Sequence, residues 1–158
     1  MNVTRRNFLA GTGIAATAVL AGCGSSNGSS DGGSASGEKT YKIGVVQLTE
    51  HAALDASNEG FVEAVNASGL PVSIDQQNAQ NDQSACQTIA SKFVGDGVDL
   101  IFAIATPAAQ AAAGATTEIP IVGTAITDFA ASGLVQDNDK PGTNVTGASD
   151  LTPVAEQL

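Results

Sequence analysis

Polar and carboxylate residues follow directly on short apolar runs at five places in this sequence of 158 residues. The candidate binding residues at these places are Gln47 with Glu50, Asn78, Ala105 with Thr106, Thr127 with Asp128, and Asp150. Together they offer hydrogen-bond donors, acceptors and carboxylates, which are the groups that orient a small polar solute in a binding site. The pattern therefore favours a site for a small molecule.

Signatures of catalysis and of a bound metal are missing from the sequence. It has no glycine-rich phosphate loop, no G-x-S-x-G nucleophile elbow and no metal-ligand spacing, and His51 is its single histidine. Asp128 and Asp150 could form an acid pair, but paired carboxylates without a nucleophile are weak evidence for catalysis. We expect a binding protein that needs no cofactor or metal. An envelope hydrolase is the enzymatic alternative.

Several of the polar residues also have a structural interpretation. Asn81 and Asp82 are expected to cap a helix rather than to bind ligand, and Thr106 is expected to be an N-cap. Asp128 could cap a short helix that follows it. His51 is expected to be a solvated loop residue. The case for a site rests on all five places meeting at one edge of the fold.

The elements that must position these residues alternate between strand and helix. Strands are expected at residues 41–48, 72–76, 99–105, 119–123 and 144–146, and helices at 54–68, 82–94, 106–115 and, as a short piece, 129–133. Gly69 is expected to end the first helix, and Gly95 with Gly97 the second. Such alternation predicts an α/β fold with a doubly wound parallel sheet. Ligands of open α/β sheets bind outside the carboxyl ends of the strands, where the five places fall.

Composition excludes two classes of partner. The chain has 16 acidic and 6 basic residues, a formal net charge of -10, and both arginines lie within the first six residues. Nucleic acids and anionic membrane surfaces are bound through clustered Lys and Arg, so we expect neither partner. With 42% hydrophobic and 14% charged residues, the chain is expected to fold around a single core.

The N-terminal part is predicted to be a targeting segment. Residues 1–22 combine a basic start, an apolar stretch too short to span a membrane and small residues, as in a secretory signal, with features of a twin-arginine signal. Residues 20–23, Leu-Ala-Gly-Cys, resemble a lipobox, which predicts lipidation of Cys23; a plain secretory peptide is the alternative. Residues 23–40 would form a Gly/Ser tether to a body at the extracytoplasmic face of the cell membrane. Cys86 then has no disulfide partner and is expected to be a buried filler.

The body also resembles a known family. The resemblance is carried by residues 47–55, 60–61, 77–82, 103–110, 119–122, 127–128 and 141–147. These motifs are similar to those of ABC transporter substrate-binding proteins of the tryptophan/tyrosine type, although Phe129 replaces the family's usual proline. The resemblance implies a type I periplasmic-binding-protein fold, in which two α/β lobes close on a solute for an ABC permease. Members are about twice as long, so residues 41–158 are expected to be a truncated, N-terminal lobe.

The family resemblance favours an aromatic amino acid as the solute, and the residues fit a zwitterion. The start of the helix at Thr106 suits a carboxylate, because helix N-termini carry free N–H groups and a positive dipole end. Asp128 or Asp150 could bind the ammonium group through charge-assisted hydrogen bonds. A sugar or nucleoside receptor, or a sensor of the same fold, is the alternative. Five Phe and one Tyr offer little surface for stacking against a sugar.

Overall fold

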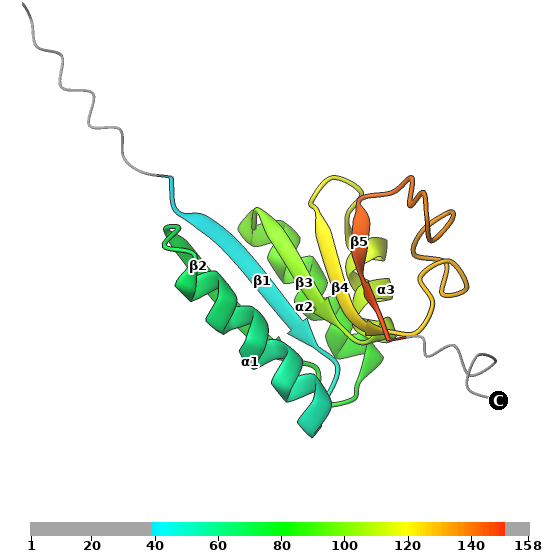
Figure 1. Cartoon of the computed structure of the whole chain (residues 1–158), viewed down its shortest axis with the longest axis horizontal. Helices are drawn as coiled ribbons and strands as arrows, with labels where there is room; N and C mark the ends of the chain where they lie inside the picture. The colour runs from blue at the N-terminus through cyan, green and yellow to red at the C-terminus, as the bar shows by residue number, and fades with distance from the viewer. Residues whose placement is uncertain (1–38, 151–158) are drawn as a thin grey trace, which may run out of the picture. The chain divides into compact units, whose positions relative to one another are not determined.

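The apolar runs form the strands of a five-stranded parallel sheet in the computed structural model, which describes residues 39–150 (Figure 1). The strands are β1 (Tyr41–Gln47), β2 (Val72–Asn78), β3 (Leu100–Ile104), β4 (Ile121–Ile126) and β5 (Val145–Ser149). Their order across the sheet is β2-β1-β3-β4-β5, and every neighbouring pair is parallel. The predicted α/β fold with a parallel sheet is confirmed.

Three helices cover the two faces of this sheet: α1 (Ala52–Ala67), α2 (Gln83–Asp96) and α3 (Thr106–Ala115). In Figure 1, α1 lies in front of the sheet, whereas α2 and α3 lie behind it. The helices belong to two separate hydrophobic clusters, because Phe61 of α1 packs with Val45 and Phe102, while Phe93 of α2 packs with Val46. The sheet is therefore doubly wound, as predicted.

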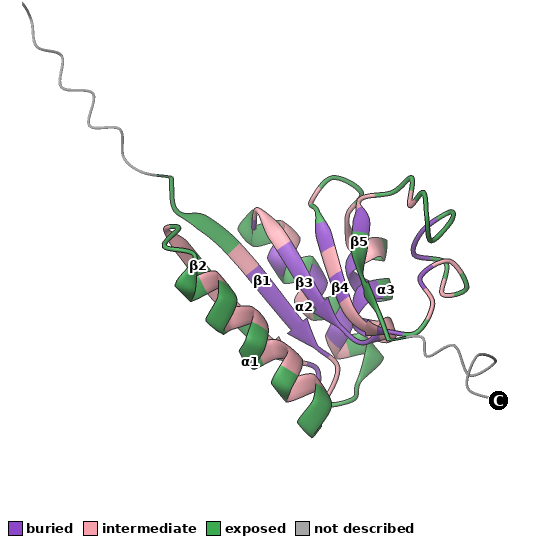
Figure 2. Ribbon diagram, in the orientation of Figure 1, coloured by how far each residue is buried: buried purple, intermediate pink, exposed green. Residues whose placement is uncertain are grey.

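The face under α2 and α3 holds the tighter core. Phe93 and Cys86 are fully buried there, which confirms the prediction for Cys86, and burial raises the pKa of its thiol. The Phe93 ring lies against Gly44 of β1, where a β-carbon would come within 2.6 Å of the ring. On the other face, the Phe61 ring stacks on Phe102 with a centroid distance of 3.9 Å. No residue of α1 is fully buried (Figure 2).

Helix ends follow the predicted caps with small shifts. The Asp82 carboxylate accepts hydrogen bonds from the Ser84 and Ala85 N–H groups at 2.7 and 3.3 Å, which confirms it as the N-cap of α2. Gly97 ends α2 with a φ of 63°, a conformation that glycine adopts without a steric penalty. Gly95 lies inside the helix, so the predicted end at residue 94 was two residues short.

The predicted short helix at residues 129–133 was wrong. These residues form hydrogen-bonded turns, with Ser132 N–H donating to the Asp128 carbonyl and Leu134 N–H to the Phe129 carbonyl. Gly133, with a φ of 70°, stops any continuation. The Phe129 side chain is buried over Gly123, so tertiary packing fixes this segment together with the turn hydrogen bonds.

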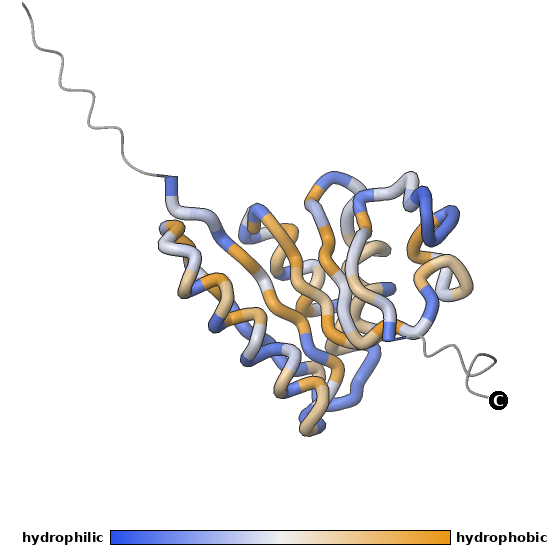
Figure 3. Tube along the Cα trace, viewed as in Figure 1, coloured by the Kyte–Doolittle hydropathy of each residue, from blue (hydrophilic) through white to orange (hydrophobic). Residues whose placement is uncertain are grey.

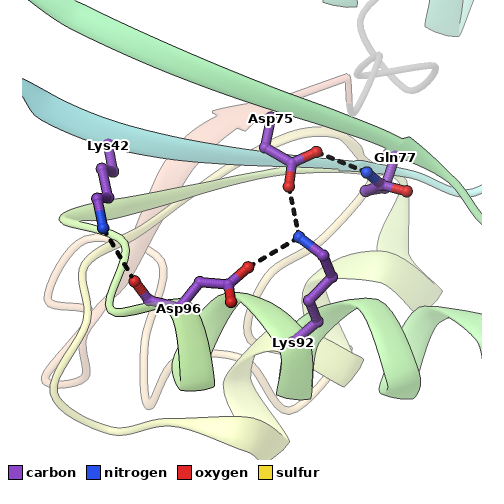
Figure 4. Close-up of polar contacts among 5 residues, drawn as sticks. All are labelled: Lys42, Asp75, Gln77, Lys92 and Asp96. Atoms are coloured by element: carbon purple, nitrogen blue, oxygen red, sulfur yellow. Dashed lines mark hydrogen bonds and ion pairs between the residues drawn. The ribbon is translucent and has the colours of Figure 1, made fainter. Parts of the chain in front are cut away.

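A charged cluster joins α2 to β2 and β1 on the face of the sheet that α2 and α3 cover (Figure 4). The Lys92 ammonium lies 2.5 Å from the Asp75 carboxylate and 2.8 Å from that of Asp96, whose carbonyl also accepts from Lys42. The hydrogen bonds from Lys92 and Gln77 lower the pKa of Asp75, and the bond to Asp75 raises that of Lys92. Because these side chains are largely solvent-accessible, the pairs add little stability.

Candidate functional site

Main-chain hydrogen bonds connect the carboxyl ends of the strands along one edge of the sheet. In strand order they run from Asn81 N–H to the Leu48 carbonyl (2.7 Å), Leu48 N–H to Ile104 (3.3 Å), Ala105 N–H to Thr124 (3.0 Å) and Asp150 N–H to Ile126 (3.1 Å). Along β1, hydropathy changes from an apolar centre to a polar end at Gln47 (Figure 3). The structure thus places all eight predicted binding residues along this edge.

The edge is too long for one small ligand to contact all of them. Neighbouring strands lie about 4.8 Å apart, so five strands extend over roughly 19 Å. Asn78, on β2, and Asp150, after β5, lie at its opposite ends. Glu50, Thr106 and Thr127 follow the central strands β1, β3 and β4. The centre of the edge is therefore where a small ligand would meet several predicted residues at once.

At the β1 end, Gln47 and Glu50 occupy different environments. Gln47 is only 3% exposed, whereas the Glu50 side chain lies in solvent. His51 is also exposed, as predicted, but it is the N-cap of α1 because its Nδ1 accepts from the Ala53 N–H at 3.3 Å. The β1–α1 loop thus presents a carboxylate immediately before a helix start.

Sequence reasoning missed the partners of Gln47. Its Nε2 donates to the Thr49 carbonyl (2.8 Å) and to Oδ1 of Asp55 (2.6 Å), and its Oε1 accepts from Nδ2 of Asn58 (3.1 Å). Asp55 and Asn58 are separated by three residues on α1 and therefore share one helix face. The spacing could be read from the sequence, but the sequence does not show that this face of α1 is turned toward Gln47 on β1.

The β3 end carries an uncapped helix start. Ala105, rather than Thr106, is the N-cap of α3, so the prediction for Thr106 was one residue off. Ala105 has φ 84° and ψ 154°, a strained conformation for a residue with a side chain, and no side chain caps the helix. Pro107, in the first turn, has no N–H. The remaining N–H groups of this turn have the donor chemistry that an anion requires.

The β4 end presents an ionised carboxylate. Oδ1 of Asp128 accepts from the Ala131 N–H and from Nδ2 of Asn138, both at 3.0 Å, and these hydrogen bonds hold the pKa of Asp128 below its usual value. The expected capping role of Asp128 thus applies to a turn, not to a helix. Asn138 was not predicted, because it lies ten residues away in an irregular loop. Thr127 is exposed, and its carbonyl accepts from the Ser149 hydroxyl.

The two ends of the edge are organised by turns. Oδ1 of Asn78 accepts from the Gln80 N–H at 2.8 Å, which fixes the turn after β2. Asp150 is exposed, and its N–H joins it to β4. In the described part of the chain, all non-glycine residues with positive φ lie at this edge: Gln80, Asn81, Ala105 and Ala125. Backbone strain of this kind concentrates at functional sites.

Other kinds of site have little support within residues 39–150. No group of three or more His, Cys, Asp or Glu side chains there could hold a metal ion. Among the same residues, no helix has the length and apolar character needed to cross a membrane.

A hollow of about 360 Å³ lies beside the β5 end of the edge, with Phe129, Asn138 and Ser149 in its lining.

The parallel sheet in the order β2-β1-β3-β4-β5, with helices on both faces, is that of the type I periplasmic-binding-protein fold. The chain belongs to the ABC transporter substrate-binding proteins, because the model of this family matches residues 42–158. Among its relatives is the tyrosine-binding protein of Clostridioides difficile (strain R20291), which is 44% identical over 153 residues. That alignment covers 92% of this chain and 44% of the relative.

Two solved structures of substrate-binding proteins are also similar to this chain. One is a substrate-binding protein with adhesive properties from Clostridium difficile in a ligand-free, open form, with 54% identity and a TM-score of 0.71 over 73% of this chain and 41% of that one. The other is an ABC domain from Streptococcus pneumonia in complex with L-Trp, with 41% identity and a TM-score of 0.71 over 75% and 41% of the two chains. This chain spans less than half the length of these relatives.

Proposed function

We propose that the chain is the N-terminal lobe of an extracytoplasmic receptor that binds an amino acid, preferably an aromatic one, for an ABC import system. The uncapped start of α3 at the centre of the carboxyl edge is the observation that carries the proposal. Two relatives support the ligand class: one is a tyrosine-binding protein, and one was solved with L-Trp bound. The ligand would lie against the edge where the predicted residues converge.

In this proposal, the N–H groups near Thr106 hold the ligand carboxylate, and Asp128 or Asp150 holds its ammonium group. Both acids follow strands on the same side of β3, the strand that leads into α3, since β4 is next to β3 and β5 is next to β4. The Asp128 carboxylate is charged at neutral pH, as the pairing with an ammonium group requires, and its hydrogen bonds lower its pKa further below that range. Glu50 and Thr127 would contact the rest of the ligand.

The sheet edge forms only one wall of such a site. Because the chain spans 44% of the tyrosine-binding relative, we propose that a second lobe supplies the opposite wall. A ligand enclosed between two lobes loses most of its contact with water, which one open edge does not achieve. This lobe alone should therefore bind an amino acid weakly.

Membrane anchoring belongs to the same proposal. The signal peptide at residues 1–22, the lipidated Cys23, the tether at residues 23–40 and the last residues, 151–158, lie outside the described part of the chain, apart from the two last tether residues. A lipid on Cys23 would hold the acidic body at the outer face of the membrane, close to its permease. Mass spectrometry of the mature N-terminus tests this: a diacylated Cys23 is expected, and an unmodified Cys23 would contradict the anchor.

The binding proposal is tested by calorimetry on the full-length receptor with L-tyrosine and L-tryptophan. Asp128→Asn and Asp150→Asn remove one charge each, and at least one of them should weaken binding by tenfold or more. Asp137→Asn is the matched control, because Oδ1 of Asp137, like that of Asp128, accepts two hydrogen bonds, here from the Asp139 and Lys140 N–H groups. If both test variants bind within threefold of the wild type, the assignment of the ammonium site is wrong.

A further inference from the structure

We infer that Gln47 is a positioning residue of the proposed binding edge: its amide holds the β1–α1 loop in place and leaves ligand contact to the residues that follow. The inference rests on the proposed function for the identity of the ligand. The loop in question comprises residues 48–51 and carries Glu50. The argument starts from the hydrogen bonds that Gln47 makes.

The amide of Gln47 has no N–H group left for a ligand. A glutamine amide has two donor hydrogens, and here they serve the Thr49 carbonyl and Oδ1 of Asp55, at 2.8 and 2.6 Å. Its oxygen accepts from Nδ2 of Asn58, and the residue is only 3% exposed. Among residues 39–150, Gln47 is the only polar residue that is buried. Its side chain therefore faces α1, not the solvent-accessible edge.

These bonds fix the loop where it leaves the sheet. The Leu48 N–H donates to Ile104, the Leu48 carbonyl accepts from Asn81, and the Thr49 carbonyl accepts from Gln47. Two successive residues of the main chain are thus held in place. Leu48 is bonded to β3 and to the β2–α2 turn, and Thr49 is bonded to the Gln47 side chain. The next residue is Glu50, which is exposed at the edge. Gln47 contributes the last restraint before Glu50.

The cluster is poorly suited to a purely stabilising role. No lysine within the described residues forms an ion pair with the half-buried Asp55. Oδ1 of Asn58 is buried and has no hydrogen-bond partner in the described structure. Incompletely satisfied polar clusters in a core cost stability relative to apolar packing. What the cluster does provide is a defined geometry between β1, the loop and α1.

The test compares two glutamines that each bond to an aspartate. Gln47→Met keeps the length of the side chain and removes every hydrogen bond of its amide. Gln77→Met removes the equivalent bond to Asp75, which lies in the charged cluster under α2 (Figure 4). In the full-length receptor, Gln47→Met should weaken binding of L-tyrosine and L-tryptophan by tenfold or more, whereas Gln77→Met should stay within twofold. Both are measured well below their melting temperatures.

Amide hydrogen exchange separates positioning from general destabilisation. The Leu48 N–H, which is hydrogen-bonded to Ile104 at the start of this loop, should exchange at least tenfold faster in Gln47→Met than in the wild type, and no faster in Gln77→Met. A folded Gln47→Met with wild-type affinity and wild-type exchange in this loop would overturn the inference, as would equal loss of affinity in Gln77→Met. If Gln47→Met does not fold, Asp55→Ala replaces it: a threefold or greater loss of affinity is expected, and an unchanged affinity would overturn the inference.

The same experiment keeps the two proposals apart. If the wild-type receptor binds neither amino acid, the proposed ligand class is wrong. Exchange at the Leu48 N–H then still decides whether Gln47 holds the loop. If the wild type binds and only the exchange result fails, Gln47 does not position the loop and the proposed function stands.

Discussion

The two faces of the sheet differ in how completely they bury apolar surface. Under α2 and α3, Phe93, Cys86 and Ala90 are fully buried against the strands, whereas α1 has no fully buried residue (Figure 2). The α1 face carries the polar cluster around Gln47 instead. The difference indicates a division of roles, in which one face supplies stability and the other connects a helix to the binding edge.

The largest expected effect comes from removing the two phenylalanines that anchor these faces. Phe93→Ala should lower the free energy of unfolding by about 3–5 kcal/mol, because it leaves a cavity in the dense core. Phe61→Ala should cost about 1–3 kcal/mol, since Phe61 is half-buried and loses mainly its stacking on Phe102. Urea unfolding of both variants measures the difference. Equal losses would contradict the division between the faces.

A second prediction concerns the close approach of β1 and α2. Gly44→Ala should destabilise the fold by about 1–3 kcal/mol, because the new β-carbon would lie 2.6 Å from the buried Phe93 ring. Gly60→Ala in α1 is the control: no atom lies within 4 Å of its added β-carbon, so a gain of about 0.5–1 kcal/mol is expected. If Gly44→Ala were as stable as the wild type in thermal unfolding, the core under α2 would be looser than described.

The smallest expected effect is on the acid side of the stability profile. The pKa of Asp128 is lowered in the folded chain by hydrogen bonds from Ala131 and Asn138, so the unfolded chain takes up this proton first as the pH falls. The stability contributed by Asp128 is therefore complete above the ordinary value of 3.8 and is lost as the pH drops through the folded pKa.

Melting temperatures between about pH 6 and pH 2.5 measure this effect. Asp128→Asn should show a shallower decline below about pH 4 than the wild type, because it lacks the titrating group. Identical slopes would mean that the hydrogen bonds of Asp128 contribute nothing to folding. Asp137→Asn, on the same loop, serves as the control.

Much of the fold was predictable because apolar runs and helix caps are local signals. All five predicted strands overlap a strand of the structure, and Asp82 was correctly predicted as the cap of α2. The carboxyl ends of three strands were missed: β2 continues to Asn78, β4 to Ile126 and β5 to Ser149, in each case past polar or small residues that interrupt the apolar run. Hydrogen bonds to the neighbouring strands hold these residues in strand conformation, and the hydropathy pattern of a sequence does not show which strands pair.

The location of the candidate site followed from topology, but its detailed chemistry did not. Parallel strands bring their carboxyl ends to one edge, so the five places could be predicted to meet. The links between Gln47 and α1, and between Asp128 and Asn138, depend on helix rotation and on loop packing. The uncapped start of α3 depends on the strained φ of Ala105, which an alanine in a sequence does not signal.

The most direct test of the account is a crystal structure of the full-length receptor with bound L-tyrosine or L-tryptophan. We expect the ligand carboxylate within hydrogen-bonding distance of the main-chain N–H groups at Thr106, and its ammonium group on Asp128 or Asp150. A ligand whose carboxylate lies on other residues, away from the start of α3, would contradict the central claim.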